Sequence, residues 1–125
     1  MTNELASSLK GKTGIKRVWN ALYYSMAGLG AAFRHEAAFR QEVFLACIMI
    51  PVALFLPVST VGKALMIGSV FLVLITELLN SGIEATVDRA SPEIHPLAKR
   101  AKDIGSAAVF MSLINLGVVW LLVII

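Results

Sequence analysis

Three long apolar segments divide the chain. Val43–Gly62 and Ile104–Ile125 contain no charged residue, and Ala64–Ile83 contains a single one, Glu77. Each segment has the length of about 20 residues that a helix needs to cross the hydrocarbon layer of a bilayer. The pattern therefore predicts an all-α membrane protein. We place its three membrane helices at residues 43–62, 64–90 and 97–125.

Prolines indicate where these helices bend or end. Pro51 and Pro57 lie within the first apolar segment, and each lacks a backbone N–H donor. The first helix is therefore expected to kink or to end early. The dipeptides Ser91-Pro92 and His95-Pro96 are expected to end the second helix near Ala90.

Before the first apolar segment, apolar residues recur at spacings of three and four, which is typical of one face of a helix. They are Trp19, Leu22, Tyr23, Met26, Leu29, Phe33 and Ala37. Lys16, Arg17, Asn20, Arg34 and His35 fall mainly on the other side. We predict an amphipathic surface helix over residues 15–42, lying in the membrane interface with its basic side toward the head groups. Residues 1–14, which include two glycines, are expected to be flexible.

Composition and charge agree with a small membrane protein of one domain, residues 1–125. The chain is 58% hydrophobic with a mean hydropathy of +0.79, too apolar for an ordinary soluble domain. Most Lys and Arg residues lie before the first apolar segment or between the second and the third. The positive-inside rule then places the N-terminus in the cytoplasm and the C-terminus outside. Anionic lipid head groups explain the net charge of +3 better than nucleic acid, so we expect no nucleic-acid partner.

Glu77 is the residue that points most directly to function. A charged group at the centre of a membrane helix costs roughly 2.5–3.5 kcal/mol on insertion scales, so a residue kept there indicates a functional site. Four polar residues follow at helical offsets and share one side of the helix with Glu77. They are Asn80, Ser81, Glu84 and Asp88, and with Glu77 they form the polar stripe. One three-helix bundle offers this stripe little polar cover at membrane depth, so we expect a homo-oligomer.

Further charged groups are expected near the same membrane surface. They are Glu36, Glu42, Lys99, Arg100, Lys102 and Asp103. Carboxylates without His or Cys partners suit a hard cation such as Mg²⁺. A lysine beside such a site neutralises phosphoryl oxygens, and a dry carboxylate can act as a base. These groups are sufficient for phosphoryl transfer.

The same acids could instead form an ion or proton path, or only support association between helices. A conduction path would continue across the bilayer, whereas the outer parts Val52–Leu56 and Val118–Ile125 are apolar. The polar groups gather on the predicted cytoplasmic side, which favours a one-sided site supplied with cytosolic ATP. The stretch Ala6–Thr13 is similar to the phosphate loop of soluble kinases, but Ala6 replaces the first glycine of that motif. We therefore expect no such loop.

Three motifs resemble those of the small integral-membrane diacylglycerol kinases of bacteria. They are Glu36-Ala-Ala-Phe-Arg-Gln-Glu42, Glu77-Leu-Leu-Asn-Ser-Gly-Ile-Glu84 with Val87-Asp-Arg89, and Arg100-Ala-Lys-Asp-Ile-Gly-Ser-Ala-Ala108. The similarity extends from about Gly14 to the end of the chain. It implies a homotrimer in the bacterial cytoplasmic (inner) membrane that phosphorylates diacylglycerol to phosphatidic acid with ATP and Mg²⁺. A sister branch phosphorylates undecaprenol, but the stretch from Val87 to Pro96 is more similar to the diacylglycerol branch.

The resemblance also implies roles for single residues. Glu77 would be the catalytic base, Asn80 would be needed for activity, and Glu36 and Glu84 would bind the metal. The implied nucleotide contacts are Arg17, Tyr24, Glu36, Glu84, Glu93, Ile94, His95, Lys102 and Asp103. The implied lipid contacts are Arg17, Tyr24, Ser25, Ala31, Ala32, Phe39, Arg40, Gln41, Glu42, Glu77 and Ser106. In this family each site is shared between neighbouring protomers.

Considered alone, several of these residues have simpler interpretations. Glu36 fits an exposed interfacial charge, Lys102 fits a positive anchor at the membrane surface, and His95 fits an exposed turn. Trp19 and Trp120 fit anchors at the membrane interface. Glu77 has no comparable interpretation, because no solvent is expected at its depth.

Overall fold

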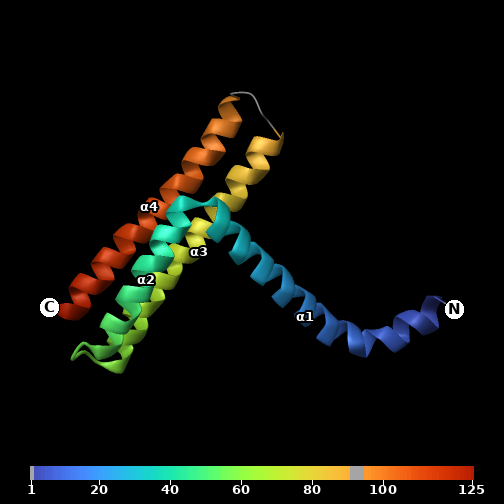
Figure 1. Cartoon of the computed structure of the whole chain (residues 1–125), viewed down its shortest axis with the longest axis horizontal. Helices are drawn as coiled ribbons and strands as arrows, with labels where there is room; N and C mark the ends of the chain where they lie inside the picture. The colour runs from blue at the N-terminus through green and yellow to red at the C-terminus, as the bar shows by residue number, and fades with distance from the viewer. Residues whose placement is uncertain (1, 91–94) are drawn as a thin grey trace.

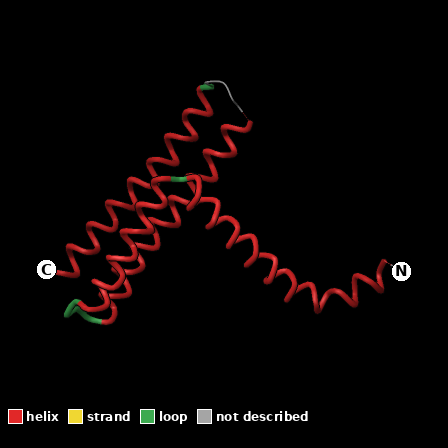
Figure 2. Tube along the Cα trace, viewed as in Figure 1, coloured by secondary structure: helices red, strands yellow, loops and turns green. Residues whose placement is uncertain are grey.

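The protein is all-helical in the part that the computed structural model describes, residues 2–90 and 95–125, with side chains described from Gly14 onward. Its helices are α1 (Thr2–His35), α2 (Ala37–Phe55), α3 (Thr60–Ala90) and α4 (Pro96–Ile124). Figure 2 shows that only short loops join them within the described residues. Three of the helices, α2, α3 and α4, are long and apolar enough to cross a membrane, which confirms the prediction of three long apolar helices.

The three apolar helices lie side by side and α1 projects away from them (Figure 1). The most extensive packing is between α3 and α4, and α2 packs against α3. Only the C-terminal part of α1 approaches the bundle, where it contacts α2 and α3. The turn between α2 and α3 lies at one end of the bundle, and the junction between α1 and α2 lies beside the middle of α3.

The first membrane helix ends early, as its prolines predict. Helix α2 continues through Pro51 and ends at Phe55, two residues before Pro57. Lys63 Nζ donates to Leu54 O at 2.6 Å, which satisfies a carbonyl that the end of the helix leaves free. At the start of α3, Ser59 Oγ accepts from Gly62 N at 3.0 Å and caps the helix.

The predicted surface helix 15–42 is wrong at its C-terminal end. The helix breaks at Glu36, where φ is −113° and ψ is 106°, and residues 37–42 belong to α2. Arg40 stabilises this break, because its Nη1 donates to Phe33 O at 2.8 Å and to Arg34 O at 3.0 Å. These two bonds replace backbone bonds that α1 loses when it ends. The break places Glu36 at a corner between two helices.

The segment 1–14, which we expected to be flexible, is helical from Thr2 onward. Most residues before Gly11 have high helix propensity, and Gly11 and Gly14 lower that propensity without ending the helix. Helix α1 is bent in its N-terminal part and straight where it approaches the bundle (Figure 1).

The interior of the bundle combines small and polar residues between α3 and α4. Met66 is fully buried, and its carbonyl oxygen accepts from Trp120 Nε1 at 3.2 Å. The same indole donates to Ser69 Oγ at 3.1 Å, and Thr76 Oγ1 donates to Ser112 Oγ at 2.9 Å. Such interhelical bonds and small contacts are what hold helices together where lipid offers no hydrophobic driving force.

Candidate functional site

The polar stripe lies on α3 and leads from the interior of the bundle to its open end. Glu77 is 6% exposed and Asn80 is 8% exposed, whereas Glu84 is half-buried and Asp88 is exposed. From Glu77 to Asp88 the helix advances by about 16 Å. The prediction of one polar face on this helix is confirmed, and its deepest member is the acid.

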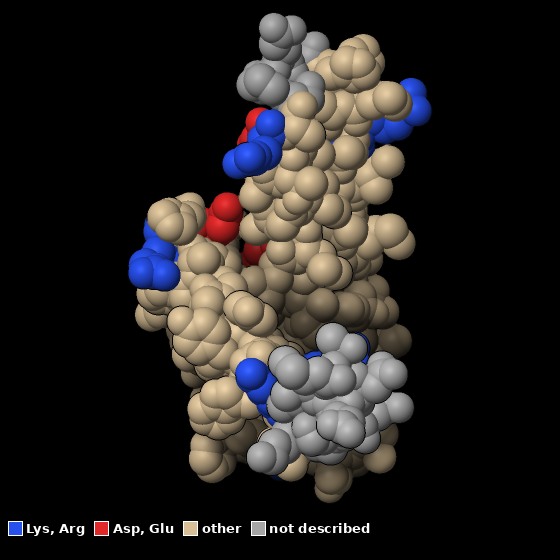
Figure 3. Space-filling model, turned by 90° about the vertical axis from the view of Figure 1, so that its right-hand side faces the viewer, with Lys and Arg blue, Asp and Glu red and all other residues tan. Residues whose placement is uncertain are grey.

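Glu77 is surrounded by other carboxyl groups. The negative charges of Glu84 and Glu36 both act on Glu77, and Glu77 in turn acts on Glu42. Glu42 Oε2 is buried without a hydrogen-bond partner. Figure 3 shows acidic groups deep in a recess between two lobes, with Lys or Arg groups on either side. The α1–α2 corner thus brings two further acids to the stripe on α3.

Asn80 joins the buried and exposed parts of the stripe. Its Nδ2 donates to Glu84 Oε1 at 3.2 Å, and its Oδ1 is buried without a partner. The Asn80 side chain lies against Gly105 of α4, where an added Cβ would be 3.3 Å from Asn80 Cγ. The sequence motifs pointed to Asn80, but they did not predict its contact with α4.

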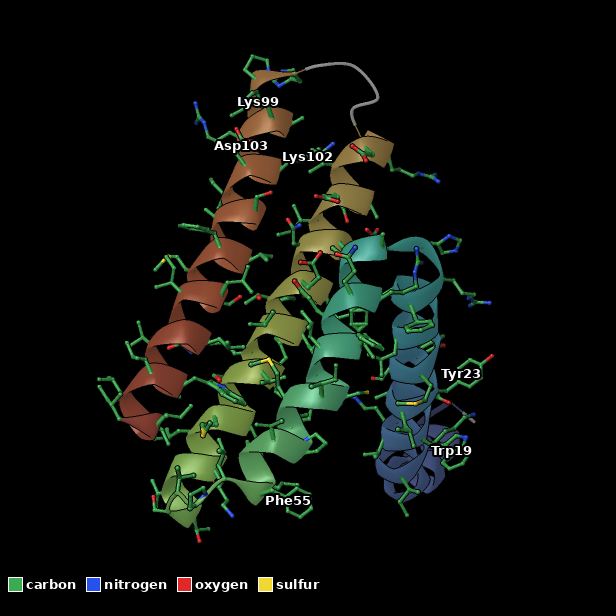
Figure 4. All side chains as sticks on the ribbon, turned by 60° about the vertical axis from the view of Figure 1, so that its left-hand side comes forward. Trp19, Tyr23, Phe55, Lys99, Lys102 and Asp103 are labelled. Carbon is green, nitrogen blue, oxygen red and sulfur yellow. The ribbon has the colours of Figure 1, made fainter. Side chains whose placement is uncertain are left out.

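Lys102 faces α3 at the open end of the stripe. Its Nζ donates to Asp88 Oδ1 at 2.8 Å, and the charge of Glu84 also acts on it. Asp103, which the resemblance also assigns to the nucleotide, forms an ion pair with Lys99 at 2.7 Å. Figure 4 shows Lys102 between α3 and α4, and Lys99 and Asp103 on the other side of α4. Adjacent residues on a helix point about 100° apart, which explains the separation.

A mostly apolar groove of about 780 Å³ lies between α1 and α3, next to the stripe. Its α1 side includes three residues that the resemblance assigns to lipid: Ser25, Ala31 and Ala32. Glu36 lines the same groove, which also reaches Ser81 of the stripe. The groove therefore joins an apolar wall to a carboxyl group that acts on Glu77.

The remaining expected lipid contacts are not all directed to this groove. Phe39 is buried, Gln41 is exposed, and Arg40 is engaged with the carbonyl groups that end α1. Ser106 is exposed on α4. These positions do not form one site within the single chain.

Several expected nucleotide contacts lie apart from the carboxyl groups. Tyr24 is twelve residues before Glu36, which places it about 18 Å away along α1, and Arg17 lies farther along the same helix. His95 caps α4, since its Nδ1 accepts from Leu97 N at 3.1 Å. Glu93 and Ile94 lie outside the described residues.

The possible metal ligands are a pair of carboxylates, Glu36 and Glu84. Among the described residues, no three or more His, Cys, Asp or Glu side chains are grouped in a way that could hold a metal ion. Mg²⁺ commonly takes only one or two protein carboxylates and completes its shell with water and phosphate oxygens. The chemistry of this pair therefore fits Mg²⁺, although the pair alone does not form a closed site.

Three apolar helices, a polar stripe that begins at the buried Glu77 and an adjacent apolar groove indicate a membrane protein with a polar site. Residues 23–124 match the family described as prokaryotic diacylglycerol kinase, and the chain belongs to this family. The resemblance seen in the motifs is thus confirmed.

Relatives named diacylglycerol kinase are similar over most of this chain. The Pseudomonas aeruginosa protein is 60% identical over 114 residues, which are 91% of this chain and 93% of that protein. The Haemophilus influenzae protein is 51% identical over 108 residues, or 86% and 92% of the two chains. The Escherichia coli K12 protein is 47% identical over 108 residues, or 86% and 88%.

Proposed function

We propose that this protein transfers the γ-phosphoryl group of ATP to the hydroxyl group of diacylglycerol, which yields phosphatidic acid and ADP. The observation that carries the proposal is Glu77, a buried carboxyl group on α3, the helix that also lines an apolar groove through Leu78 and Ser81, in a chain of the prokaryotic diacylglycerol kinase family. A membrane lipid can bring its hydroxyl group to this depth, whereas a soluble acceptor would have to leave water.

Glu77 acts as the general base in this proposal. It takes the proton of the lipid hydroxyl while the hydroxyl oxygen bonds to the γ-phosphorus and the bond from that phosphorus to the β–γ bridging oxygen breaks. Burial supports this role, because bulk water at the reacting phosphorus would compete with the lipid. Asn80 supports the site from the next turn through its bond to Glu84.

Glu36 and Glu84 would hold Mg²⁺ against the ATP phosphates. The ion would neutralise charge that develops on the phosphoryl oxygens. Both carboxylates act electrostatically on Glu77, which supports placing the metal and the base in one site. Lys102 lies at the open end of the α3–α4 gap, where a phosphate could replace Asp88 as its partner.

A homotrimer with shared sites is the second part of the proposal. Tyr24 and Arg17 lie on α1, 12 and 19 residues before Glu36, and thus well away from it along the helix. Large apolar side chains of α1 are also uncovered, and in Figure 4 Trp19 and Tyr23 point away from the other helices. Lipid head groups and neighbouring protomers would cover these surfaces and would bring a second α1 to each site.

The Lys and Arg distribution supports a cytoplasmic N-terminus and an external C-terminus in the bacterial inner membrane. The polar stripe then opens toward cytosolic ATP. The alternative acceptor is undecaprenol, the substrate of the sister branch.

The acceptor is tested with purified protein in detergent micelles and ATP labelled in its γ-phosphate. Diacylglycerol and undecaprenol are offered separately. We expect label in phosphatidic acid and little in undecaprenyl phosphate. The opposite result would assign the chain to the sister activity, and label in neither lipid would reject the kinase proposal.

A further inference from the structure

The absence of a side chain at Gly105 determines how Asn80 sits in the α3–α4 interface. A Cβ on Gly105 would overlap Asn80 Oδ1 and would lie 3.3 Å from Cγ and 3.8 Å from Cβ of the same residue. The Asn80 side chain therefore occupies the space that a side chain at position 105 would need. Asn80 is a short, buried residue and has little freedom to move aside.

The orientation of the Asn80 amide follows from its two neighbours. A carboxylate accepts hydrogen bonds and cannot donate them, so the NH₂ group must face Glu84. Nδ2 donates to Glu84 Oε1 at 3.2 Å, and this leaves Oδ1 directed at α4 without a partner. Only glycine at position 105 leaves room for that oxygen.

We propose that Gly105 is a positioning residue that acts through Asn80 on Glu84 and so on divalent-cation binding. The inference rests on the proposed function, which uses Glu84 as a metal ligand. Hydrogen bonds to a ligating carboxylate fix its orientation, and removing such outer partners typically lowers metal affinity or activity by 10- to 100-fold. A methyl group at position 105 would displace the amide and release the Glu84 carboxylate.

The test compares Gly105→Ala with Gly117→Ala in the full-length protein in micelles. Gly117 lies on the same helix, and an added Cβ there would meet no atom within 4 Å. Alanine favours a helix more than glycine does, so neither change weakens α4 itself. Binding of Mn²⁺, which accepts carboxylate ligands as Mg²⁺ does, is followed by the electron paramagnetic resonance signal of the free ion.

We expect Gly105→Ala to raise the Mn²⁺ dissociation constant by about tenfold or more, with no change for Gly117→Ala. The Mg²⁺ concentration for half-maximal phosphorylation should rise in parallel. In an Asn80→Ala background the overlap is gone, so Gly105→Ala should have no further effect. This double variant keeps the test valid even where Gly105→Ala alone fails to fold.

Unchanged Mn²⁺ affinity in Gly105→Ala would overturn the inference. It would also be overturned if the fold-loss of Mn²⁺ affinity in the double variant equals the product of the fold-losses in the two single variants. A parent protein that binds no Mn²⁺ would overturn it as well. A parent that binds Mn²⁺ and shows the Gly105 effect, yet transfers no phosphate to any lipid, would uphold the positioning role and reject the proposed function.

Discussion

At the scale of single residues, the charges that act on Glu77 among the described residues are those of two other carboxylates, Glu84 and Glu36. The carboxyl groups of Glu36, Glu42 and Glu84 lie close enough to act on it or to be acted on by it. A proton or a bound cation would offset the repulsion among these carboxylates. A divalent cation between Glu36 and Glu84 would supply that offset and leave Glu77 available to accept a proton.

Metal dependence should therefore change when either proposed ligand loses its charge. Glu36→Gln and Glu84→Gln keep the shape of the side chain and remove a hard ligand. We expect each to raise the Mg²⁺ concentration needed for half-maximal phosphorylation by about tenfold or more, and to weaken binding of the metal–ATP complex. The measurement is a Mg²⁺ titration at fixed ATP. If both variants titrate like the parent, the ligands lie elsewhere.

Local spacing was enough to predict the polar stripe, but not the contacts it makes. Glu77 and Glu84 share a helix face, so their relation follows from the helix geometry alone. The contact of Asn80 with Gly105 and the ion pair of Lys102 with Asp88 depend on how α4 is rotated against α3. Because this rotation leaves no local pattern in the sequence, neither contact could be predicted from it.

At the scale of helices, α3 and α4 are joined by polar contacts within the apolar region. Trp120 is the largest of these side chains and reaches the Met66 carbonyl oxygen and Ser69 Oγ. It was expected to anchor at the membrane interface, and the structure gives it these interhelical bonds.

Removing the indole donor should loosen this interface. Trp120→Phe keeps an aromatic ring and loses the N–H, and we expect the free energy of unfolding to fall by about 0.5–2 kcal/mol. The measurement is unfolding by denaturing detergent in mixed micelles. Trp19→Phe is the matched control, because Trp19 lies on α1, outside the α3–α4 interface, and is 69% exposed. Equal losses in both variants would show that the interhelical bond contributes nothing.

Helix ends that depend on one residue were predictable, and those that depend on distant contacts were not. Pro57 cannot continue a helix, so an early end of α2 followed from the sequence. The break at Glu36 interrupts an apolar pattern that continues to Ala37, and it is stabilised by Arg40 from the next helix. The spacing of apolar residues does not reveal a side-chain hydrogen bond of this kind. For this reason the sequence predicted a surface helix that continues to residue 42.

At the scale of the whole molecule, a single chain leaves large apolar surfaces uncovered. Helix α1 projects from the bundle with large apolar side chains exposed, and α4 buries only Gly105 and Ser112 among its residues. Lipid covers part of such a surface, and the proposed trimer would cover the rest. The three membrane helices were predictable from length and hydrophobicity, whereas an association between chains leaves no periodic signal in one chain.

Sharing of sites can be tested by mixing two inactive chains. Glu77→Gln lacks the proposed base and Lys102→Ala lacks the proposed phosphate contact, and each alone should be inactive. If one site takes these residues from different protomers, mixed trimers regain some intact sites and part of the activity returns. Mixing that restores nothing would reject sharing between these two residues, and crosslinking that yields only monomers and dimers in a bilayer would count against the trimer.

The central claim is that Glu77 removes the proton from a lipid hydroxyl during phosphoryl transfer, and one measurement addresses it most directly. Parent and Glu77→Gln proteins are reconstituted in the same bilayer with diacylglycerol, and transfer of label from ATP is followed beside equilibrium binding of Mg²⁺–ATP. A positioned base contributes about 10²–10⁴-fold, so we predict a loss of transfer of more than a hundredfold with nucleotide binding retained. Near-normal turnover in Glu77→Gln would contradict the account.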